Sequence, residues 1–583
     1  MAELGAEAVR AAAERAAAEA ASRSGEPARA GTVGTGATGA DGPPGPDPRR
    51  QSAVLDEAHL GDIQGAFGTI RQQEGEHPSS WKRRLLTFAA IVGPGIIVMV
   101  GDNDAGGVST YAQAAQDYGL TLLWTLPLLI PVLVVNQEMV VRLGAVTGVG
   151  HARLINERFG KFWGAFSVGD LFILNFLTIM TEFIGVNLAL SYFGVTPYLS
   201  VPIAAVALVA MTATGSFRRW ERFMFVFIFA NLLVIPLAVF SHPHASSVFR
   251  DLVVPGVHGG FTSTSVLLII AIVGTTVAPW QLFFQQSNVV DKRITPRWIS
   301  YERADTVIGS FVTVITATLL VAVVAAAFVG TSLFGHFQDA ETVARGLERY
   351  VGHASGALFS IILLNASLIG AASVTLATSY AFGDVFGARH SLHRSWREAK
   401  FFYASFTAMV VVAAGIVLVP HAPLGLITTG VQALAGVLLP SATVFLLLLC
   451  NDREVLGPWV NRPWLNAVAF VIVSILLVLS LVLMATTVFP HIDVRTLAVG
   501  MGAALLASYV VAGVGYVWAL RRRPPEPVVP RARRDNWRMP PLNLLERPTW
   551  SRGRLAAMFS LRAYLVIAVV LLAVKAFQLG LHK

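Results

Sequence analysis

Long apolar stretches, each about the length of a membrane-crossing helix, fill most of this chain and constrain its fold more than any other feature. A bilayer crossing needs about 20 predominantly apolar residues. Only 14% of the residues are charged, whereas a soluble domain has about 25%. We therefore predict an all-α polytopic membrane protein. Spans are expected near 86–117, 119–141, 163–193, 199–215, 223–241, 264–289, 304–330, 355–381, 401–420, 426–450, 465–489 and 496–520, and the sequence leaves open whether 563–580 also crosses.

Two of these stretches are interrupted where a membrane helix would be continuous. Residues 93–107 combine glycines with Asp102 and Asp104, and residues 274–281 contain Pro279. An unwound backbone at membrane depth persists only where protein or a water-filled cavity satisfies it. Paired breaks in corresponding halves of a chain are typical of a transporter's binding site. The carboxylates beside the first break favour a cation as the substrate.

The basic residues indicate the orientation of the spans. Lys and Arg gather in alternate loops, at 82–84, 142–161, 218–222, 292–303, 389–400, 453–462 and 521–523. The positive-inside rule then predicts a plasma-membrane protein with a cytoplasmic N-terminus. This pattern accounts for the net charge of +9 without nucleic-acid binding. The single cysteine, Cys450, excludes a disulfide framework or a thiolate cluster, and no P-loop motif for ATP-driven pumping is present.

The chain divides into four parts by composition. Residues 1–80 read as a disordered, low-complexity cytoplasmic tail, and residues 81–450 as the transporter core. Residues 451–520 add two further membrane helices, and 521–583 form a basic cytoplasmic tail around the apolar segment 563–580. We expect 521–553 to be a solvated linker that also contacts anionic lipid. The loop 332–354 is expected to contain a short external helix.

Acidic residues at membrane depth each cost about 2.5–3.5 kcal/mol on insertion scales, so each needs an explanation. Asp104 sits on the first break, and we interpret it as a metal ligand. Asp102 could equally line a vestibule or cap a helix. Glu138 and Glu182 favour hydrogen-bonded positions inside the bundle, and Asp305, near a span end, favours a solvated or capping role.

Several motifs, taken in order, resemble the Nramp family of divalent-metal transporters over about residues 81–520. The resemblance implies a LeuT-like fold with inverted five-helix repeats at about 86–241 and 264–450. The motifs that carry it are Gly93-Pro94-Gly95 with Asp104, residues 137–148, Glu182-Phe183-Ile184-Gly185, Phe217-Arg218-Arg219-Trp220-Glu221, residues 274–281, and Gln432 before Pro440.

The departures from the family pattern are informative. Gly107 replaces the motif asparagine, and Ala278 replaces the motif methionine, a soft ligand. Trp280 and Gln285 stand where the family has histidines, and Ile179 replaces an aspartate. These changes resemble the Nramp-related magnesium transporter branch. The family uses the missing groups for soft-metal selection and for proton movement.

The resemblance implies a metal site in which Asp104 holds a partly hydrated ion. Gly101 and Thr275 would supply carbonyl oxygens, and Gly107 and Ala278 would set the volume of the site. The side-chain amides of Gln281 and Gln432 would bind the water that the ion retains. We assign the permeation path or coupling region to Asp102, Trp280, Gln285, Glu138, Glu182 and Ile179. Trp280 could instead pack against the first span.

We therefore predict a non-enzymatic importer of Mg²⁺, with Mn²⁺ as a weaker substrate, that works by alternating access without proton coupling. Its partners would be the metal ion and the lipid bilayer, and no resident cofactor is expected. One alternative is a proton-coupled Mn²⁺/Fe²⁺ importer. Others are a sodium-coupled organic-solute symporter on the same fold and a non-transporting membrane receptor. The sequence predicts no oligomeric state.

Overall fold

The computed structural model describes residues 57–71, 80–419, 424–489, 492–522 and 529–546, with individual positions between 553 and 567. Within that part, ten helices are long and apolar enough to cross a membrane, or eleven if the bent pair α2 and α3 forms one span. The only sheet in the described residues is a two-stranded hairpin. The predicted class, an all-α polytopic membrane protein, is confirmed.

The first half of the core begins with a broken helix, α3 (Pro94–Gly101) and α4 (Ala105–Tyr118). Three of the ten membrane-length helices and one shorter apolar helix, α8 (Pro197–Thr212), follow it. The three are α5 (Thr125–Thr147), α7 (Lys161–Tyr192), and α9 (Phe217–Ala230) continued through a 3-10 turn into α10 (Val234–Ser241).

The second half repeats this order and also begins with a broken helix, α12 (Ser263–Thr276) and α13 (Pro279–Asp291). It continues with α14, α16, α17 and α18, and two later helices, α20 and α21, complete the described spans. Their bounds are α14 (Ile299–Phe328), α16 (His353–Phe386), α17 (Lys400–Val417), α18 (Leu424–Cys450), α20 (Pro463–Val488) and α21 (Val494–Arg522).

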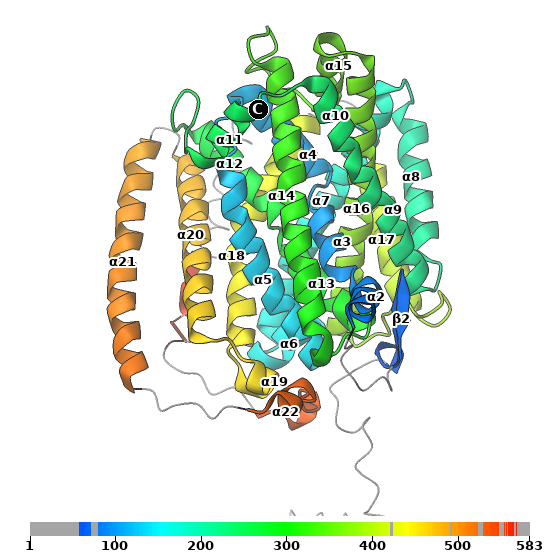
Figure 1. The fold of residues 1–583 in the computed structure, drawn as a ribbon, viewed down its shortest axis with the longest axis vertical. Helices are drawn as coiled ribbons and strands as arrows, with labels where there is room; N and C mark the ends of the chain where they lie inside the picture. The colour runs from blue at the N-terminus through cyan, green and yellow to red at the C-terminus, as the bar shows by residue number, and fades with distance from the viewer. Residues whose placement is uncertain are drawn as a thin grey trace, which may run out of the picture. The chain divides into compact units, whose positions relative to one another are not determined.

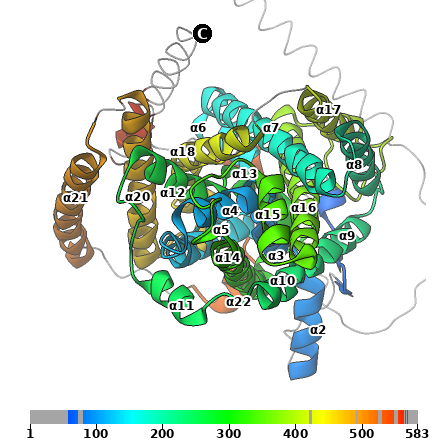
Figure 2. The same ribbon diagram turned by 90° about the horizontal axis from the view of Figure 1, so that it is seen from above.

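The broken helices lie in the interior of the bundle. Figure 2 shows α4 and α13 enclosed by α5, α7, α14, α16 and α18, with α20 and α21 to one side. Residues of the α12–α13 span are almost entirely buried. Gly274 of α12 lets this helix touch α18, because a Cβ there would overlap the carbonyl oxygen of Gln432. The two breaks are thus surrounded by protein, as unwound backbone in a membrane requires.

Some predicted boundaries were wrong. The predicted span 86–117 starts too early, because α2 (Trp81–Ile91) bends by 52° from α3 around Gly93, whose φ is +155°. The predicted span 119–141 also starts early, since Gly119 (φ +64°) ends α4 and turns separate it from α5. The short helix predicted in the loop 332–354 is present as α15 (Ala340–Tyr350), and its external location remains a prediction. The segment 563–580 lies almost wholly outside the described residues.

Residues 57–71 are structured, although we expected a disordered tail up to residue 80. Strands β1 (Ile63–Gly65) and β2 (Gly68–Ile70) form an antiparallel hairpin with Ile63 opposite Ile70. Both isoleucines are buried. Arg218 of α9 donates to the carbonyls of Gly65 (3.1 Å) and Gly68 (3.2 Å), so the hairpin is fixed to the core.

The basic segment 529–546 also packs on the core, although we expected a solvated linker. The Trp459 indole donates to the Arg534 carbonyl at 2.9 Å, and Arg158 of α6 (His151–Phe159) donates to the Glu546 carbonyl at 2.6 Å. The backbone N–H of Met539 donates to the Val146 carbonyl at 3.3 Å. Buried Met539 anchors this segment in spite of its basic composition.

The loops rich in Lys and Arg share one end of the helices, called the basic end below. Figure 1 shows α2, β2, α6, α19 (Arg453–Leu456) and α22 (Arg531–Asp535) at this end, and α11 (Ala245–Val253) and α15 at the other. Ion pairs join the loops here: Arg158 contacts Asp452 at 2.8 Å, and Lys292 contacts Glu221 at 2.6 Å. A cytoplasmic location of this end remains a prediction of the positive-inside rule.

Candidate cation-binding site

The two helix breaks meet inside the bundle. The amide of Gln281, in the first turn of α13, donates to Oδ1 of Asp102 at the end of α3. A Cβ at Gly107 would lie 2.7 Å from the Asp102 carbonyl oxygen and 3.1 Å from Oγ1 of Thr275. Residues of four helix ends therefore surround one small region.

Each break frees backbone carbonyls from their helical hydrogen bonds, among them those of Gly101 and Thr275. In an α-helix a carbonyl accepts from the N–H four residues later. For Thr275 that residue is Pro279, which has no N–H. For Gly101 it is Ala105, whose N–H donates instead to Oε2 of Glu182 at 3.1 Å. The carbonyls of Gly101 and Thr275, which the family resemblance implied as ligands, thus have no helical N–H donor.

Asp104 occupies the N-cap of α4. One of its oxygens, Oδ1, accepts from the Gly107 N–H at 2.7 Å, and Thr275 lies beside the same carboxylate. The carboxyl group of Glu182 lies within hydrogen-bonding range of Asp104. Glu182, expected to be structural, therefore contacts both the predicted metal ligand and the break.

Asp102 is the end of a chain of side-chain amides. Gln281, which donates to it, accepts from the Gln137 amide at 3.0 Å and also donates to the Thr276 carbonyl at 3.1 Å. The second oxygen of Asp102 is buried and has no hydrogen-bond partner among the described residues. Asp102 thus presents an oxygen to the region between the breaks, so the lining role expected as one option fits it.

The site is tightly packed and closed to solvent. Asp102, Asp104, Thr275, Ala278 and Gln281 are each buried. The expected open space beside Gly107 is absent from this conformation, because the Asp102 carbonyl fills it. The rim of the Trp280 ring lies 3.3 Å from where a Cβ of Gly101 would stand, so Trp280 packs directly against the break.

Gln432 of α18 forms another wall. Its amide packs on Gly106, where a Cβ would overlap Nε2. This nitrogen is buried and makes no hydrogen bond within the described part of the chain. Ser373 of α16 also lies beside the first break, with Oγ 3.7 Å from the Cβ position of Gly101. Both side chains can bind water held next to an ion.

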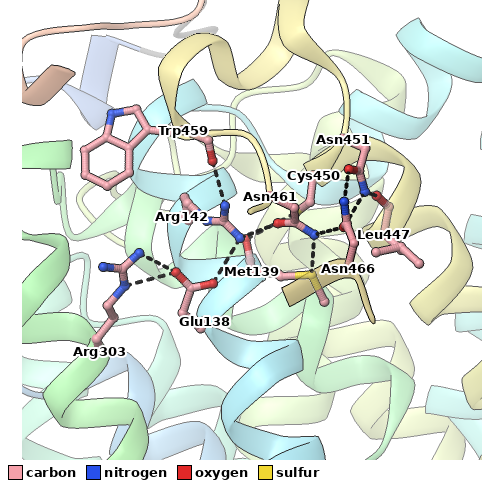
Figure 3. A network of polar contacts seen from close by, with 10 residues as sticks. All are labelled: Glu138, Met139, Arg142, Arg303, Leu447, Cys450, Asn451, Trp459, Asn461 and Asn466. Atoms are coloured by element: carbon pink, nitrogen blue, oxygen red, sulfur yellow. Dashed lines mark hydrogen bonds and ion pairs between the residues drawn. The ribbon is translucent and has the colours of Figure 1, made fainter. Parts of the chain in front are cut away.

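Three residues assigned to the path lie in other contacts. Gln285 donates to Oγ1 of Thr306 at 3.0 Å, which links α13 to α14, and Ile179 is buried in α7. Glu138 pairs with Arg142 (3.0 Å) and Arg303 (2.5 Å) near the basic end, as Figure 3 shows.

Asp305 caps the helix that leads to the site. It accepts from the backbone N–H groups of Gly93 (3.0 Å), Gly95 (2.8 Å) and Ile96 (3.2 Å), at the N-terminus of α3. The capping option is confirmed, but Asp305 is buried rather than solvated. A carboxylate here complements the partial positive charge of the helix end.

The chemistry of the site is that of hard oxygen ligands. Carboxylates, amide oxygens and freed carbonyls surround it, and these are groups that Mg²⁺ and similar cations accept. Across the described residues, no group of three or more His, Cys, Asp or Glu side chains is arranged to hold a metal ion. A cation bound here would therefore need oxygen ligands from the backbone and the side-chain amides as well as from the carboxylates.

Sequence reasoning missed several members of the site. Gln137 orients Gln281, and the amide of Asn103 donates to the Thr313 carbonyl at 3.2 Å, which ties the first break to α14. The Tyr111 hydroxyl hydrogen-bonds to Thr276 at 2.8 Å across the two broken helices. Asn103 lies between the two aspartates of the break, a signal that could have identified it.

Comparison with known proteins gives a consistent result. A family model described as "Natural resistance-associated macrophage protein-like" (Nramp) matches residues 95–486. The chain is 28% identical over 425 residues to the divalent metal cation transporter MntH of Bacillus subtilis, covering 70% of this chain and 93% of that protein. It is 25% identical over 434 residues to the protein of the same name from Staphylococcus aureus, covering 71% and 94%.

Solved structures share the fold. The crystal structure of an Eremococcus coleocola manganese transporter, in complex with an aromatic bis-isothiourea compound, aligns with a TM-score of 0.54 at 21% identity. It covers 76% of this chain and 97% of that one. A mutant of the same transporter aligns with a TM-score of 0.56 at 20% identity, covering 78% and 98%.

Proposed function

The chain belongs to the Nramp family, and from that premise we propose that it is a divalent metal cation transporter that imports Mg²⁺, with Mn²⁺ as a weaker substrate. Two relatives that this chain covers over more than nine tenths of their length are named divalent metal cation transporters. One observation carries the proposal: the two helix breaks meet around Asp104, with the carbonyls of Gly101 and Thr275 released from helical bonding.

The choice of Mg²⁺ depends on ligand type. Mg²⁺ is a hard ion that prefers oxygen and keeps part of its water shell. Ala278 supplies no thioether at the position where the family has methionine, so a preference for softer ions such as Mn²⁺ is weakened. In this proposal Asp104 attracts the ion, and Gln281 and Gln432 bind the waters that it retains.

Alternating access is required because the site is buried. Each half of the core begins with a broken helix, and rocking of one group of helices against the other would open the site to either side in turn. The tight fit at Gly107 and Trp280 then describes a closed conformation. Entry of a hydrated ion would require these groups to move apart.

We further propose that transport is not coupled to protons. Trp280, Gln285 and Ile179 replace the titratable groups that the family uses for proton movement. One observation favours the alternative, a proton-coupled importer. Asp104 and Glu182 are neighbouring buried carboxyl groups, and such a pair favours sharing a proton or holding a cation between them.

Ion uptake by protein reconstituted into vesicles tests both the proposed preference for Mg²⁺ and the proposed absence of proton coupling. Purified protein would be placed in vesicles that contain a pH-sensitive dye, and uptake of Mg²⁺, Mn²⁺ and Ca²⁺ would be followed separately. We expect Mg²⁺ uptake without internal acidification, and weaker Mn²⁺ uptake. Acidification in step with metal uptake would replace this proposal with the proton-coupled one, and Mn²⁺ uptake far above that of Mg²⁺ would reject the assigned substrate.

A further inference from the structure

A cavity of about 340 Å³ lies at the basic end, apart from the cation site. It is bounded by α5, the first turns of α14 and α20, the loop 457–462 and the segment that contains α22. Four guanidinium groups and one carboxylate line it: Arg142, Arg303, Arg462, Arg534 and Glu138. The lining therefore has an excess of three positive charges, which is unusual beside the apolar core of a membrane protein.

The single carboxylate is already used. Oε1 of Glu138 accepts from Nε and Nη2 of Arg303 at 3.0 and 2.5 Å, and Oε2 accepts from Arg142 at 3.0 Å. Arg142 also donates to the Trp459 carbonyl and to Asn461, each at 2.6 Å. Figure 3 shows these side chains as one connected network. Glu138 is thus shared by two arginines and leaves the other two without a carboxylate in the cavity.

Arg534 and Arg462 supply the charge that the cavity's single carboxylate, Glu138, does not compensate. The Arg534 guanidinium stacks on the Trp459 ring at 4.6 Å, and its Nε is buried without a hydrogen-bond partner in the described residues. Asp535, which lies outside the cavity lining, forms a long ion pair with Arg534 (3.8 Å) and is shared with Arg531 (3.4 Å). Arg462 is exposed at the N-cap of α20, a 26-residue helix whose N-terminus adds partial positive charge. Arg462 has no ion pair in the part of the chain that the structure describes.

The rest of the lining is apolar and reaches the surface of the bundle. Val134, Val135, Val460 and Leu465 form the wall, and Trp464 at the rim is 60% exposed. Tryptophan at such a position is typical of the membrane–water interface. One side of the cavity therefore suits an anion and the other suits hydrocarbon.

We propose that this cavity binds a phosphate group, held by Arg462, Arg534 and Arg303. Guanidinium groups bind phosphate oxygens in a bidentate manner, and basic pockets between membrane helices are suited to anionic lipid headgroups. The phosphate could belong to an anionic phospholipid or to a free phosphate compound. The apolar wall beside the arginines favours the phospholipid, whose first acyl carbons would cover Val134 and Leu465.

Binding would have a structural consequence. Arg534 belongs to the segment 529–546, whereas Arg303 and Arg462 belong to the membrane helices. A phosphate between them would link this C-terminal segment to the core. The segment would then be most stably attached when the ligand is bound.

The test uses the full-length protein in detergent and two double variants. R462Q/R534Q removes the charges that Glu138 does not compensate, and R531Q/R533Q removes two exposed charges from the same short helix outside the cavity. Phosphatidylglycerol, phosphatidylcholine and inorganic phosphate would be added separately. Thermal unfolding and native mass spectrometry would report binding, so that a less stable variant can still be scored by its bound lipid.

We expect phosphatidylglycerol to stabilise the wild type and R531Q/R533Q alike. We expect it to bind R462Q/R534Q at least about 10-fold more weakly, because two charged hydrogen-bond donors are lost. Phosphatidylcholine should have little effect. If inorganic phosphate alone reproduces the effect, the site is a phosphate site but the lipid source is excluded. Equal binding by both double variants, or equal effects of both lipids, would overturn the proposal.

Discussion

The backbone N–H of Ala105 donates to Oε2 of Glu182, 77 residues away in sequence, and not to the Gly101 carbonyl. This hydrogen bond holds the first break open, because it removes the donor that would continue α3 into α4. The acid of α7 therefore acts on the cation site through the backbone. A carbonyl without its helical donor is free to face an ion, so the same bond prepares one of the proposed ligands.

Two substitutions of Glu182 separate the effect of its hydrogen bond to Ala105 from the effect of its charge. In E182Q the amide oxygen can still accept from Ala105, whereas E182A leaves the N–H free to bond to Gly101. We expect E182A to weaken Mg²⁺ binding by about 10-fold, because one carbonyl ligand is lost, and E182Q to weaken it less. Titration calorimetry of the two purified variants measures this difference. Equal losses in both would show that charge, and not the hydrogen bond, is what Glu182 contributes.

Asp104 has two roles that can be distinguished by substitution. Asn is as good an N-cap as Asp, so D104N should keep the bond to Gly107 and the start of α4, whereas D104A should lose it at a cost of about 1 kcal/mol. Both variants lose the charge. We expect Mg²⁺ binding to fall by about 100-fold or more in each, because a carboxylate–cation interaction is strong in a buried site.

The matched control for Asp104 is D170N. Asp170 is another acid of the helix bundle, but its carboxylate accepts from Ser441 at 3.1 Å. D170N should bind Mg²⁺ as the wild type does. If D104N bound Mg²⁺ normally, Asp104 would be a helix cap only, and the proposed site would have to be abandoned.

Metal selectivity should follow the residue at position 278. A278M places a thioether at the start of α13. We expect the uptake of Mn²⁺ relative to that of Mg²⁺ to rise by about 10-fold, equivalent to about 1.4 kcal/mol. A278L is the control of similar size without sulfur. Competition between the two ions during uptake measures the ratio. A gain of the same size in A278L would mean that volume, and not sulfur, controls selectivity.

Much of this architecture can be predicted from the sequence for physical reasons. Apolar length marks the spans, and glycines beside Asp104 or a proline such as Pro279 inside such a run indicate a break, since lipid does not tolerate free backbone groups. A proline alone does not decide it, because Pro131 and Pro440 lie inside continuous helices. The two breaks and the residues on them were therefore predicted. That the two breaks form one site was predicted from their pairing in the two halves. The contact of Gln281 with Asp102 was not predicted.

Other features depend on contacts between distant segments. The hairpin 57–71 has only two buried isoleucines, too short a pattern to separate it from a tail, and Arg218 fixes it from α9. The segment 529–546 has a basic composition that indicates a solvated linker, yet Met539 is buried. The space expected beside Gly107 is also absent, because the size of a side chain does not reveal what backbone approaches it.

The ion pair of Glu221 and Lys292 should be important for stability. Both side chains are fully buried 2.6 Å apart, and Lys292 also donates to the carbonyls of Ile91 (2.6 Å) and Val92 (2.9 Å). K292M leaves a buried carboxylate without its partner, at an expected cost of about 3–5 kcal/mol. The double variant E221M/K292M should recover most of this loss, because two apolar side chains replace the pair.

Thermal unfolding of these variants measures the effect. The control is R345Q, which breaks the exposed pair of Arg345 and Glu341 on α15, and which should cost less than about 1 kcal/mol. If K292M were no less stable than R345Q, the buried pair would contribute little. A double variant as unstable as K292M would show that the lysine's bonds to the backbone, and not the charge pair, carry the effect.

His151 should make stability depend on pH. It lies at the start of α6, outside the membrane spans, and its Nδ1 is 2.8 Å from the amide oxygen of Gln286. Burial lowers the pKa of His151 from 6.5 to about 4. Below pH 6.5 the unfolded chain therefore takes up a proton that the folded protein does not. Stability from this residue is complete above pH 6.5 and is lost as the pH falls toward 4, by about 3 kcal/mol in total.

The variant H151Q isolates this contribution, because glutamine can bond to Gln286 but does not titrate. Unfolding midpoints of wild type and H151Q should differ between pH 7 and pH 4.5, with the variant losing less stability as the pH falls. Other titrating groups are common to both proteins and cancel in the difference. H244Q, which replaces an exposed histidine, should follow the wild type. If H151Q also followed the wild type, His151 would be protonated in the folded protein, and its burial would have to be offset by a partner.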